Sequence, residues 1–167
     1  MKYLRAVEPE DLELMYLVEN DPMVVAHSVT SVPLSRYALK QYIEQCRGDL
    51  YADAQVRLTI MNPDNGQPCG FLDLTDFMPR HRRAQVGIVL LPEAQGRGVA
   101  TEVLREVGEY ARLQGLHQLY AVVMSTNSRA RSLFQRAGYN EIACLPEWLL
   151  SDDRYVDAIL FHTILSQ

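Results

Sequence analysis

A short glycine-rich segment, Gln95–Ala100, joins the most apolar stretch of the chain to its clearest helical pattern. The residues before it, Val86–Leu91, form a continuous apolar run that is typical of a buried strand. The residues after it, Gly98–Gln114, carry apolar side chains at helical spacing along one face, and Gly115 closes the pattern. A buried strand that passes through a tight turn into an amphipathic helix predicts a fold in which helices pack on a sheet.

The rest of the chain shows further strand and helix patterns, separated by turn residues. Strands are predicted near Lys2–Val7, Val56–Met61, Gly70–Phe77, Leu119–Met124, Asn140–Leu149 and Arg154–Leu165. Helices are predicted near Pro9–Asn20, Ser35–Cys46 and Ser128–Ala137, and a loop is expected over Val24–Pro33. The order β-α-α-β-β-β-α-β-α-β-β predicts an α+β domain with a mixed sheet, which we expect to be a single domain over residues 1–167.

Composition restricts the class of function. The 167 residues suit one domain, and 48% hydrophobic with 22% charged residues is typical of a soluble protein. The formal net charge of −5 argues against nucleic acid, whose phosphates attract clusters of Lys and Arg. No apolar run approaches the roughly 18 residues of a membrane span, and Glu8 comes too early for a signal peptide. We therefore expect no membrane partner and a cytoplasmic location.

Cysteine and histidine spacing gives no sign of a disulfide framework or a metal site. The residues concerned are Cys46, Cys69, Cys144, His27, His81, His117 and His162. The cysteine number is odd and no Cys-x-x-Cys pair occurs, so the cysteines are interpreted as reduced structural residues. The histidines lack the spacing of metal ligands on a helix or beside cysteine, so no metal is expected.

The glycine-rich segment suits a phosphate. Glycines let backbone N–H groups approach a ligand closely, and a helix start adds unpaired N–H groups and positive potential. A tight turn without any ligand remains an alternative. The dinucleotide fingerprint G-x-G-x-x-G fails because Thr101 occupies its sixth position and no acidic residue ends the next strand. A P-loop is excluded because Gly-Lys-Ser/Thr is absent.

Two motifs resemble those of the GNAT acetyltransferases. Gln95-x-x-Gly98-x-Ala100 matches the signature Q/R-x-x-G-x-G/A of that superfamily. The second landmark, usually N-x-x-A-x-x-x-Y-x-x-x-G-F, is similar to Asn127-x-x-Ala130-x-x-x-Phe134-x-x-x-Gly138-Tyr139. A closer likeness to the bacterial spermidine N-acetyltransferases and their ribosomal-protein acetyltransferase relatives rests on His81–Ala84, Leu91–Thr101 and Tyr155-x-x-Ala158-Ile159.

The resemblance implies the GNAT fold, a mixed and mostly antiparallel seven-stranded sheet flanked by helices, and acetyl-CoA as co-substrate. The cofactor-binding residues that it implies are Ile88, Val89, Leu90, Gln95, Gly96, Arg97, Gly98, Val99, Ala100, Thr101, Asn127 and Arg136. In such families the pyrophosphate lies on the glycine-rich loop, and the pantetheine arm bonds to the backbone of the preceding strand. Gly87, isolated in that strand, indicates either a bulge or relief of packing.

Acetyl transfer to an amine needs a neutral nitrogen, a polarised carbonyl and a proton for the leaving thiolate. The resemblance implies that backbone N–H groups of Ile88–Leu90 polarise the carbonyl. Phe134 stands where the family has its acidic tyrosine, so two readings stay open. Either water or another hydroxyl serves the thiolate, with Tyr139 as one candidate, or the protein binds acetyl-CoA with little transfer; we favour a working enzyme.

Two carboxylates, Asp73 and Asp76, occupy positions where the spermidine enzymes also have acids. At a spacing of three they point to opposite faces of a regular strand, so only one should face the site unless a bulge intervenes. Either could steer a cation or relay its proton, and Asp73 is preferred because it lies deeper in the strand. Gln85 replaces a glutamate of those enzymes, and Ser28–Pro33 replaces an acidic, aromatic stretch.

The sequence therefore predicts an acetyl-CoA-dependent N-acetyltransferase that acts on a small amine, with a polyamine-like compound first. Asp73 and Phe134 mark the expected catalytic positions, and Asp73, Asp76 and Gln85 the expected substrate contacts. Two alternatives stay open: acetylation of a protein N-terminus, and a weakly active or non-catalytic acetyl-CoA-binding module. Homo-oligomerisation is left open.

Overall fold

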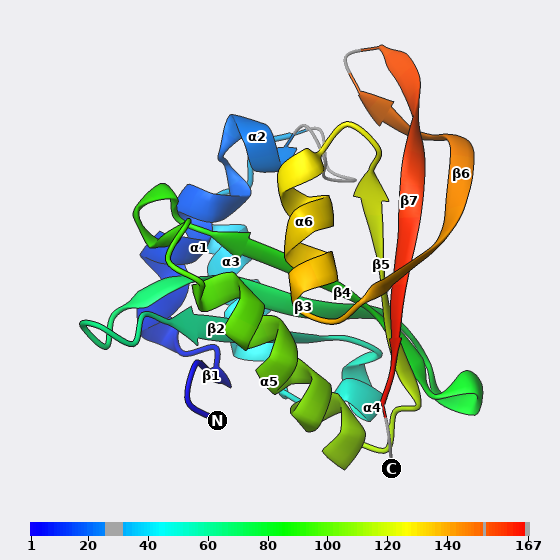
Figure 1. Ribbon diagram of the computed structural model, residues 1–167. Helices are drawn as coiled ribbons and strands as arrows, with labels where there is room; N and C mark the ends of the chain where they lie inside the picture. The colour runs from blue at the N-terminus through cyan, green and yellow to red at the C-terminus, as the bar shows by residue number, and fades with distance from the viewer. Residues whose placement is uncertain (26–31, 152, 166–167) are drawn as a thin grey trace.

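The computed structural model describes residues 1–25, 32–151 and 153–165. Within these residues one seven-stranded sheet has the order β1-β2-β3-β4-β5-β7-β6 (Figure 1). Its strands are β1 (Leu4–Ala6), β2 (Val56–Met61), β3 (Pro68–Met78), β4 (Arg83–Leu90), β5 (Gln118–Met124), β6 (Asn140–Ser151) and β7 (Arg154–Ile164). Neighbouring strands are antiparallel except β4 and β5, which are parallel. The predicted mixed, mostly antiparallel sheet is confirmed.

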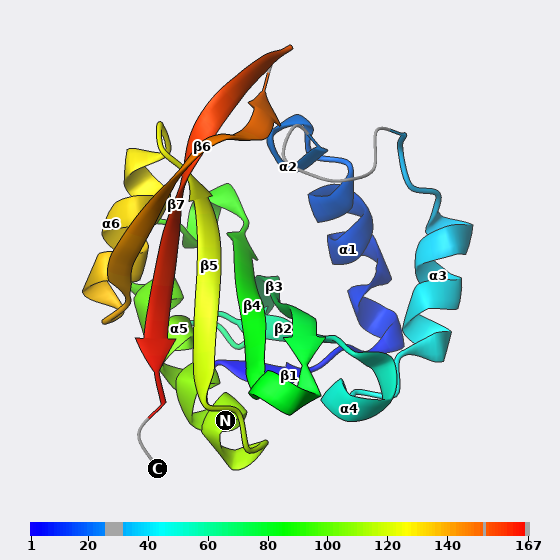
Figure 2. The same cartoon turned by 90° about the vertical axis from the view of Figure 1, so that its right-hand side faces the viewer.

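Helices cover both faces of the sheet. They are α1 (Leu12–Glu19), α2 (Pro22–Val25), α3 (Arg36–Gln45), α4 (Leu50–Asp53), α5 (Val99–Leu113) and α6 (Ser128–Arg136). Figure 2 shows α5 and α6 on one side of the sheet and α1 with α3 on the other, and we call these sides the α5/α6 face and the α1/α3 face. No helix within the described residues is long and apolar enough to cross a membrane.

Each face has its own hydrophobic cluster. On the α5/α6 face, the apolar stripe of α5 packs on alternate residues of the central strands, including Leu72, Val86 and Ala121. On the α1/α3 face, Phe71 of β3 is fully buried among the apolar residues of the two helices. The burial of β5 alternates strictly, so one side of this strand is covered while its α1/α3 face is only half-buried.

The predicted element order is confirmed, with two short helices added. The first two residues of the loop expected over Val24–Pro33 lie in α2 instead, and residues 26–31 are outside the described residues. The sequence also missed α4, because four residues are too short to show a helical period. Asp49 begins that helix by accepting hydrogen bonds from the backbone N–H groups of Tyr51 and Ala52.

The parallel strands β4 and β5 separate soon after they meet. They pair only over Arg83–Gln85 and Gln118–Tyr120. Beyond these residues, Val86–Leu90 of β4 keep their antiparallel pairing with β3 but have no partner on β5. We call this divergence the β4–β5 fork. It leaves one backbone edge of β4 unpaired in the middle of the sheet, in the strand that precedes the glycine-rich loop.

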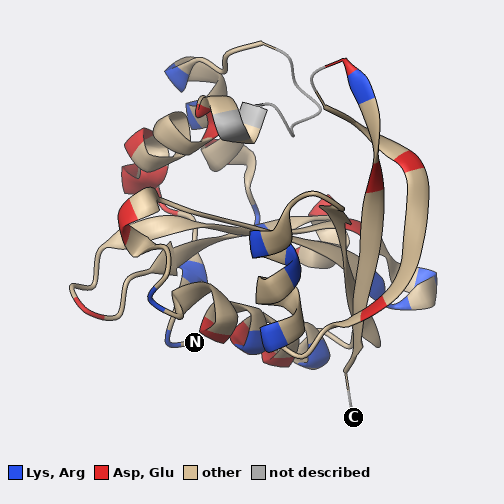
Figure 3. Ribbon diagram, turned by 45° about the horizontal axis from the view of Figure 1, so that its top comes forward, with Lys and Arg blue, Asp and Glu red and all other residues tan. Residues whose placement is uncertain are grey.

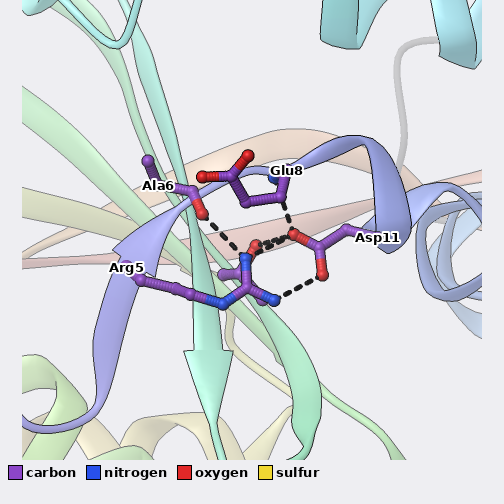
Figure 4. Close-up of polar contacts among 5 residues, drawn as sticks. Arg5, Ala6, Glu8 and Asp11 are labelled. Carbon is purple, nitrogen blue, oxygen red and sulfur yellow. Dashed lines mark hydrogen bonds and ion pairs between the residues drawn. The ribbon is translucent and has the colours of Figure 1, made fainter.

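A buried aspartate ties the N-terminal strand to the first helix. Asp11 is 1% exposed, and its carboxylate accepts two hydrogen bonds from Arg5, each of 2.7 Å (Figure 4). The backbone N–H of Glu8 and the hydroxyl of Thr59 on β2 also donate to it. Burial alone would raise the pKa of Asp11, but these donors hold it below its ordinary value. The ionised carboxylate therefore stabilises the folded chain.

Asp11→Asn should lower the free energy of unfolding by about 2 kcal/mol at pH 7, because hydrogen bonds to charged groups contribute roughly 1.5–3 kcal/mol. Urea titration measures the loss, and Glu10→Gln, an exposed acid next to it, is the matched control. Because the folded pKa is lowered, the contribution of Asp11 is present above its unfolded pKa of about 3.9 and disappears as pH falls through the folded pKa. The difference between wild type and variant should therefore shrink below about pH 4. A difference that stays constant to pH 3 would contradict this account.

Candidate active site

The glycine-rich loop has an open backbone at the start of the longest helix. Gly96 and Gly98 have φ angles of +76° and +82°, a left-handed conformation that favours glycine. A Cβ atom added to either glycine would meet no atom within 4 Å. The 15-residue helix α5 begins at Val99, so its free N–H groups and positive dipole end lie at this open space. The residues present therefore fit a phosphate group.

Gln95, the first residue of the motif, anchors the loop. Its side-chain amide donates to the backbone carbonyl of Leu90 at 2.7 Å, which ties the loop to the last residue of β4. In the described chain, this bond gives the glutamine of the signature a structural role. Any cofactor contact of Gln95 stays a prediction.

A cavity of about 540 Å³ lies beside the loop and carries several arginines. Its lining includes Gly98 and Thr101 of the predicted set, Arg97 and Arg136, and also Arg105. Arg97 pairs loosely with Asp64 at 3.7 Å, and Arg105 pairs with Glu102. The sequence missed Arg105 because its place in the outer stripe of a helix looks like an ordinary solvated position. This charge balance suits an anionic, phosphate-rich cofactor such as acetyl-CoA.

The two sequence motifs meet at the open end of the β4–β5 fork. The glycine-rich loop follows the end of β4, and Asn127 follows the end of β5. Asn127 caps α6, because its side-chain oxygen accepts from the backbone N–H of Ala130 at 3.0 Å. Ile88, Val89 and Leu90 lie along the unpaired side of the fork, where their strand has room for a hydrogen-bonding ligand.

Gly87 lies in a regularly paired part of β4 and not at a bulge. Its pairing with Asp73 belongs to a continuous register from Gly70 to Thr75, so the alternative of a bulge at Gly87 is wrong. An added Cβ would meet no atom within 4 Å, so the other alternative, relief of packing against the described residues, is wrong as well. The residue leaves volume on the α1/α3 face of β4.

Asp73 is held in an ion-pair network. Arg57, its cross-strand neighbour on β2, donates from Nε and Nη2 to the two carboxylate oxygens at 2.7 and 2.9 Å. The third nitrogen of Arg57, Nη1, donates to Glu19 at 2.5 Å. Although burial opposes its charge, these two acids raise the pKa of Arg57. The substrate-binding role predicted for Asp73 stays a prediction. Its carboxylate is already paired with Arg57.

Asp76 lies at a bulge that changes the expected alternation. Its φ is +46°, and the pairing of β3 with β4 shifts between Thr75 and Met78. Phe77, the next residue, is buried in the α5/α6 cluster, where strict alternation from Phe71 would not place it. The bulge thus turns Asp76 to the α1/α3 face, the same face as Asp73.

The carboxylate of Asp76 accepts a hydrogen bond from the hydroxyl of Tyr120 on β5. Tyr120 is also the register partner of Gln85, the third predicted substrate contact, at the last rung before the strands part. The bulge therefore brings together Asp76, Gln85 and Tyr120 at the closed end of the fork. Sequence reasoning missed Tyr120, because a tyrosine in an apolar strand carries no functional signal.

Phe134 is buried on the inner face of α6. Its ring stacks on Phe161 of β7 with centroids 5.8 Å apart and meets the edge of Tyr139 at 5.2 Å. The hydroxyl of Tyr139 is buried and has no hydrogen-bond partner among the described residues, and burial raises its pKa. The described residues contain no group of three or more His, Cys, Asp or Glu that could hold a metal ion.

Comparison with known proteins gives a consistent family. The sequence model of the acetyltransferase (GNAT) domain family matches residues 3–140 of this chain. The spermidine N(1)-acetyltransferase of Escherichia coli (strain K12) is 27% identical over 163 residues, which cover 93% of this chain and 82% of that protein. Its counterpart in Vibrio cholerae is 24% identical over 165 residues, with 98% and 93% covered. The crystal structure of spermidine N-acetyltransferase from Vibrio cholerae with CoA and spermine matches with a TM-score of 0.84 at 24% identity, covering 97% and 94%.

The fold and the site together define an acetyl-CoA-dependent acyltransferase. The chain belongs to the GNAT acetyltransferase family, because the family model covers well over half of it. The predicted fold and class of enzyme are thereby confirmed.

Gly98→Val should weaken acetyl-CoA binding at least about tenfold, or roughly 1.4 kcal/mol, because the side chain would fill the open space at the helix start. Valine at φ +82° is also strained, so Gly48→Val, at φ +67° and equally open, is the matched control for strain. Titration calorimetry and thermal unfolding should show both variants destabilised but only Gly98→Val impaired in binding. Unchanged affinity in a folded Gly98→Val protein would remove the loop from the cofactor site.

Phe134→Tyr should raise kcat with a good amine about 10- to 100-fold if the reaction lacks an acid at this position, because general acids contribute on about this scale. Steady-state assays of CoA thiol release measure kcat. Tyr139→Phe is the companion variant, which tests whether the hydroxyl of Tyr139 protonates the thiolate. An unchanged kcat in a folded Phe134→Tyr protein would mean that another group protonates the thiolate or that the new hydroxyl misses the sulfur. A loss of kcat in Tyr139→Phe would identify that group.

Proposed function

We propose that this chain transfers the acetyl group of acetyl-CoA to a primary amine of a small polycation of the polyamine type. The observation that carries this proposal is a difference in charge between the helices of the two faces. Helices α5 and α6 together have five arginines and three glutamates, whereas α1 and α3 have three glutamates, one arginine and one lysine. Helix α6 on one face has three arginines and no acid, whereas α1 on the other has two glutamates and no basic residue (Figure 3). An anionic cofactor and a cationic amine are thus favoured on opposite sides of the fork.

The acids near the fork support a cationic substrate. Glu19 and Asp73 share a single guanidinium, that of Arg57, so this network keeps one net negative charge on the α1/α3 face. Asp76 adds a second carboxylate on the same face. Relatives from Escherichia coli and Vibrio cholerae that match over most of this chain are spermidine acetyltransferases, which is consistent with this chemistry. Gln85 in place of a glutamate reduces the charge available to hold a polyamine.

The chemistry follows from the positions of the chain's own groups. Acetyl-CoA, when bound, supplies an activated thioester. The unpaired backbone edge at Ile88–Leu90 would align the cofactor and donate N–H groups toward the carbonyl oxygen. A carboxylate on the α1/α3 face would attract the protonated amine, whose pKa is near 10, and accept its proton directly or through water. Because Phe134 cannot donate a proton, the thiolate would leave without an acid from α6.

Assembly, location and extent are part of the same proposal. We propose one catalytic domain over residues 1–167, acting in the cytoplasm as a homo-oligomer. The end of the β6–β7 hairpin exposes Trp148, Leu150 and Tyr155 by 60%, 56% and 67%. Exposed apolar side chains of this size favour association, and a related spermidine N-acetyltransferase of Vibrio cholerae forms a dodecamer.

Release of free CoA thiol tests the proposal. Purified protein with acetyl-CoA should turn over triamines and tetramines with a kcat/KM at least about tenfold above that of a monoamine of equal length, because one ion pair contributes up to about 1 kcal/mol and several add. Peptides with free N-termini and a no-amine control complete the panel. Preference for peptides would replace the polyamine proposal with N-terminal acetylation. Binding of acetyl-CoA without thiol release from any amine would leave only the binding-module alternative.

A further inference from the structure

Tyr120 supplies a hydroxyl on the substrate side of the sheet. Its neighbours Leu119 and Ala121 are buried in the α5/α6 cluster, so its own side chain lies on the α1/α3 face. The hydroxyl donates to the carboxylate of Asp76. Burial first, and then this hydrogen bond, raise the pKa of Tyr120 to about 12, so the phenol is a neutral donor at physiological pH. The bond therefore fixes the direction of Asp76 without neutralising its charge.

The Asp76–Tyr120 pair spans the two halves of the sheet at the point where they part. Asp76 belongs to the bulge of β3, and Tyr120 to β5 beside the last parallel rung at Gln85. Two residues farther along β4, Gly87 leaves open volume on the same face. A small cation that enters this volume from the α1/α3 side meets the pair at the closed end of the β4–β5 fork.

Among the described residues, Asp76 makes no ion pair, whereas Asp73 makes one with Arg57. Both oxygens of Asp73 accept from Arg57, at 2.7 and 2.9 Å. Asp76 is exposed and makes no ion pair within residues 1–25, 32–151 and 153–165. Arg83 is a cation near the pair: its guanidinium carbon lies 6.0 Å from the ring centre of Tyr120. Its Nη2 donates to the sulfur of Met78 rather than to Asp76, so the carboxylate keeps room for a second cation.

We infer that Asp76 is the carboxylate that receives a cationic nitrogen of the amine substrate, and that Tyr120 is the positioning residue that holds this carboxylate in place. The assignment rests on the proposed function, because it concerns a cationic amine at the same site. The sequence analysis preferred Asp73 over Asp76. It assigned no role to Tyr120, which lies outside the two family motifs.

The tyrosine matters because a free aspartate would rotate. A carboxylate that is already oriented loses less side-chain freedom when the ammonium group binds, so more of the attraction is retained as affinity. The bulge has the same effect on the backbone, since it sets Asp76 in a conformation that aspartate tolerates better than most residues. Removing the hydroxyl should therefore weaken amine binding only while the carboxylate is present.

A double-mutant cycle tests this coupling. Asp76→Asn should raise KM for a polyamine about fivefold, as expected for loss of one ion pair near 1 kcal/mol, and the change should shrink at high salt. Tyr120→Phe should raise KM about two- to threefold, whereas the double variant should be no worse than Asp76→Asn. Tyr37→Phe and Glu44→Gln, on the exposed surface of α3, are matched controls that should leave KM unchanged.

Each outcome bears on one claim. Additive effects of the two substitutions would show that Tyr120 acts on the fold rather than through Asp76. An unchanged KM in Asp76→Asn together with a raised KM in Asp73→Asn would overturn the assignment of the carboxylate. Titration calorimetry with acetyl-CoA, which should give wild-type affinity for every variant, separates misfolding from loss of amine binding. Failure of wild type to turn over any polyamine would instead sink the proposed function, before the variants are compared.

Discussion

The short parallel pairing between β4 and β5 is the constraint on which the rest of the structure depends. In a regular sheet every backbone N–H and C=O group of an inner strand is hydrogen-bonded to a neighbouring strand. Here the pairing of β4 with β5 stops after Gln85 and Tyr120. The remaining edge of β4 is held in place by β3 alone, and Gly70 allows that contact to be close: an added Cβ would lie 2.2 Å from the carbonyl oxygen of Val89. A rigid strand with one free edge thus lies at the centre of the molecule, and the glycine-rich loop and the cap of α6 lie at its open end.

Charge divides this arrangement into two sides. The N-terminal dipole end of α5 and the arginines that line the cavity beside it favour phosphate on one face, and carboxylates on α1 and β3 favour a cation on the other. At the β4–β5 fork the sheet is interrupted, so groups bound on the two faces can meet there. An anion and a cation that react with each other can therefore approach from opposite directions without competing for the same groups, which explains why a net acidic chain still has an arginine-lined cavity.

The sequence predicted the local features and missed those that depend on pairing between distant segments. The strand, glycine turn and helix around Gly98 could be predicted because the signal for each lies in residues that are close together in the sequence. The bulge at Asp76 is not visible, since its residue type is common in ordinary turns and its signal is a register shift against β4. The partners of Arg57 are 16 and 38 residues away, so no spacing rule could assign Asp73 to an ion pair. Tyr120 was hidden for the same reason.

The positions of the tyrosine hydroxyls suggest how the chain divides the chemical work. Relative to the family motif, the phenol is absent at Phe134, and the one at Tyr139 is buried without a partner in the described chain. The thiolate of coenzyme A is a fair leaving group, with a pKa of roughly 8.5 by analogy with cysteine, so loss of an acid slows the transfer without preventing it. The amine, whose pKa is near 10, carries the larger burden of deprotonation at neutral pH. An oriented carboxylate on the amine side therefore addresses the harder proton transfer, and Tyr120, a half-buried phenol on that side, orients it.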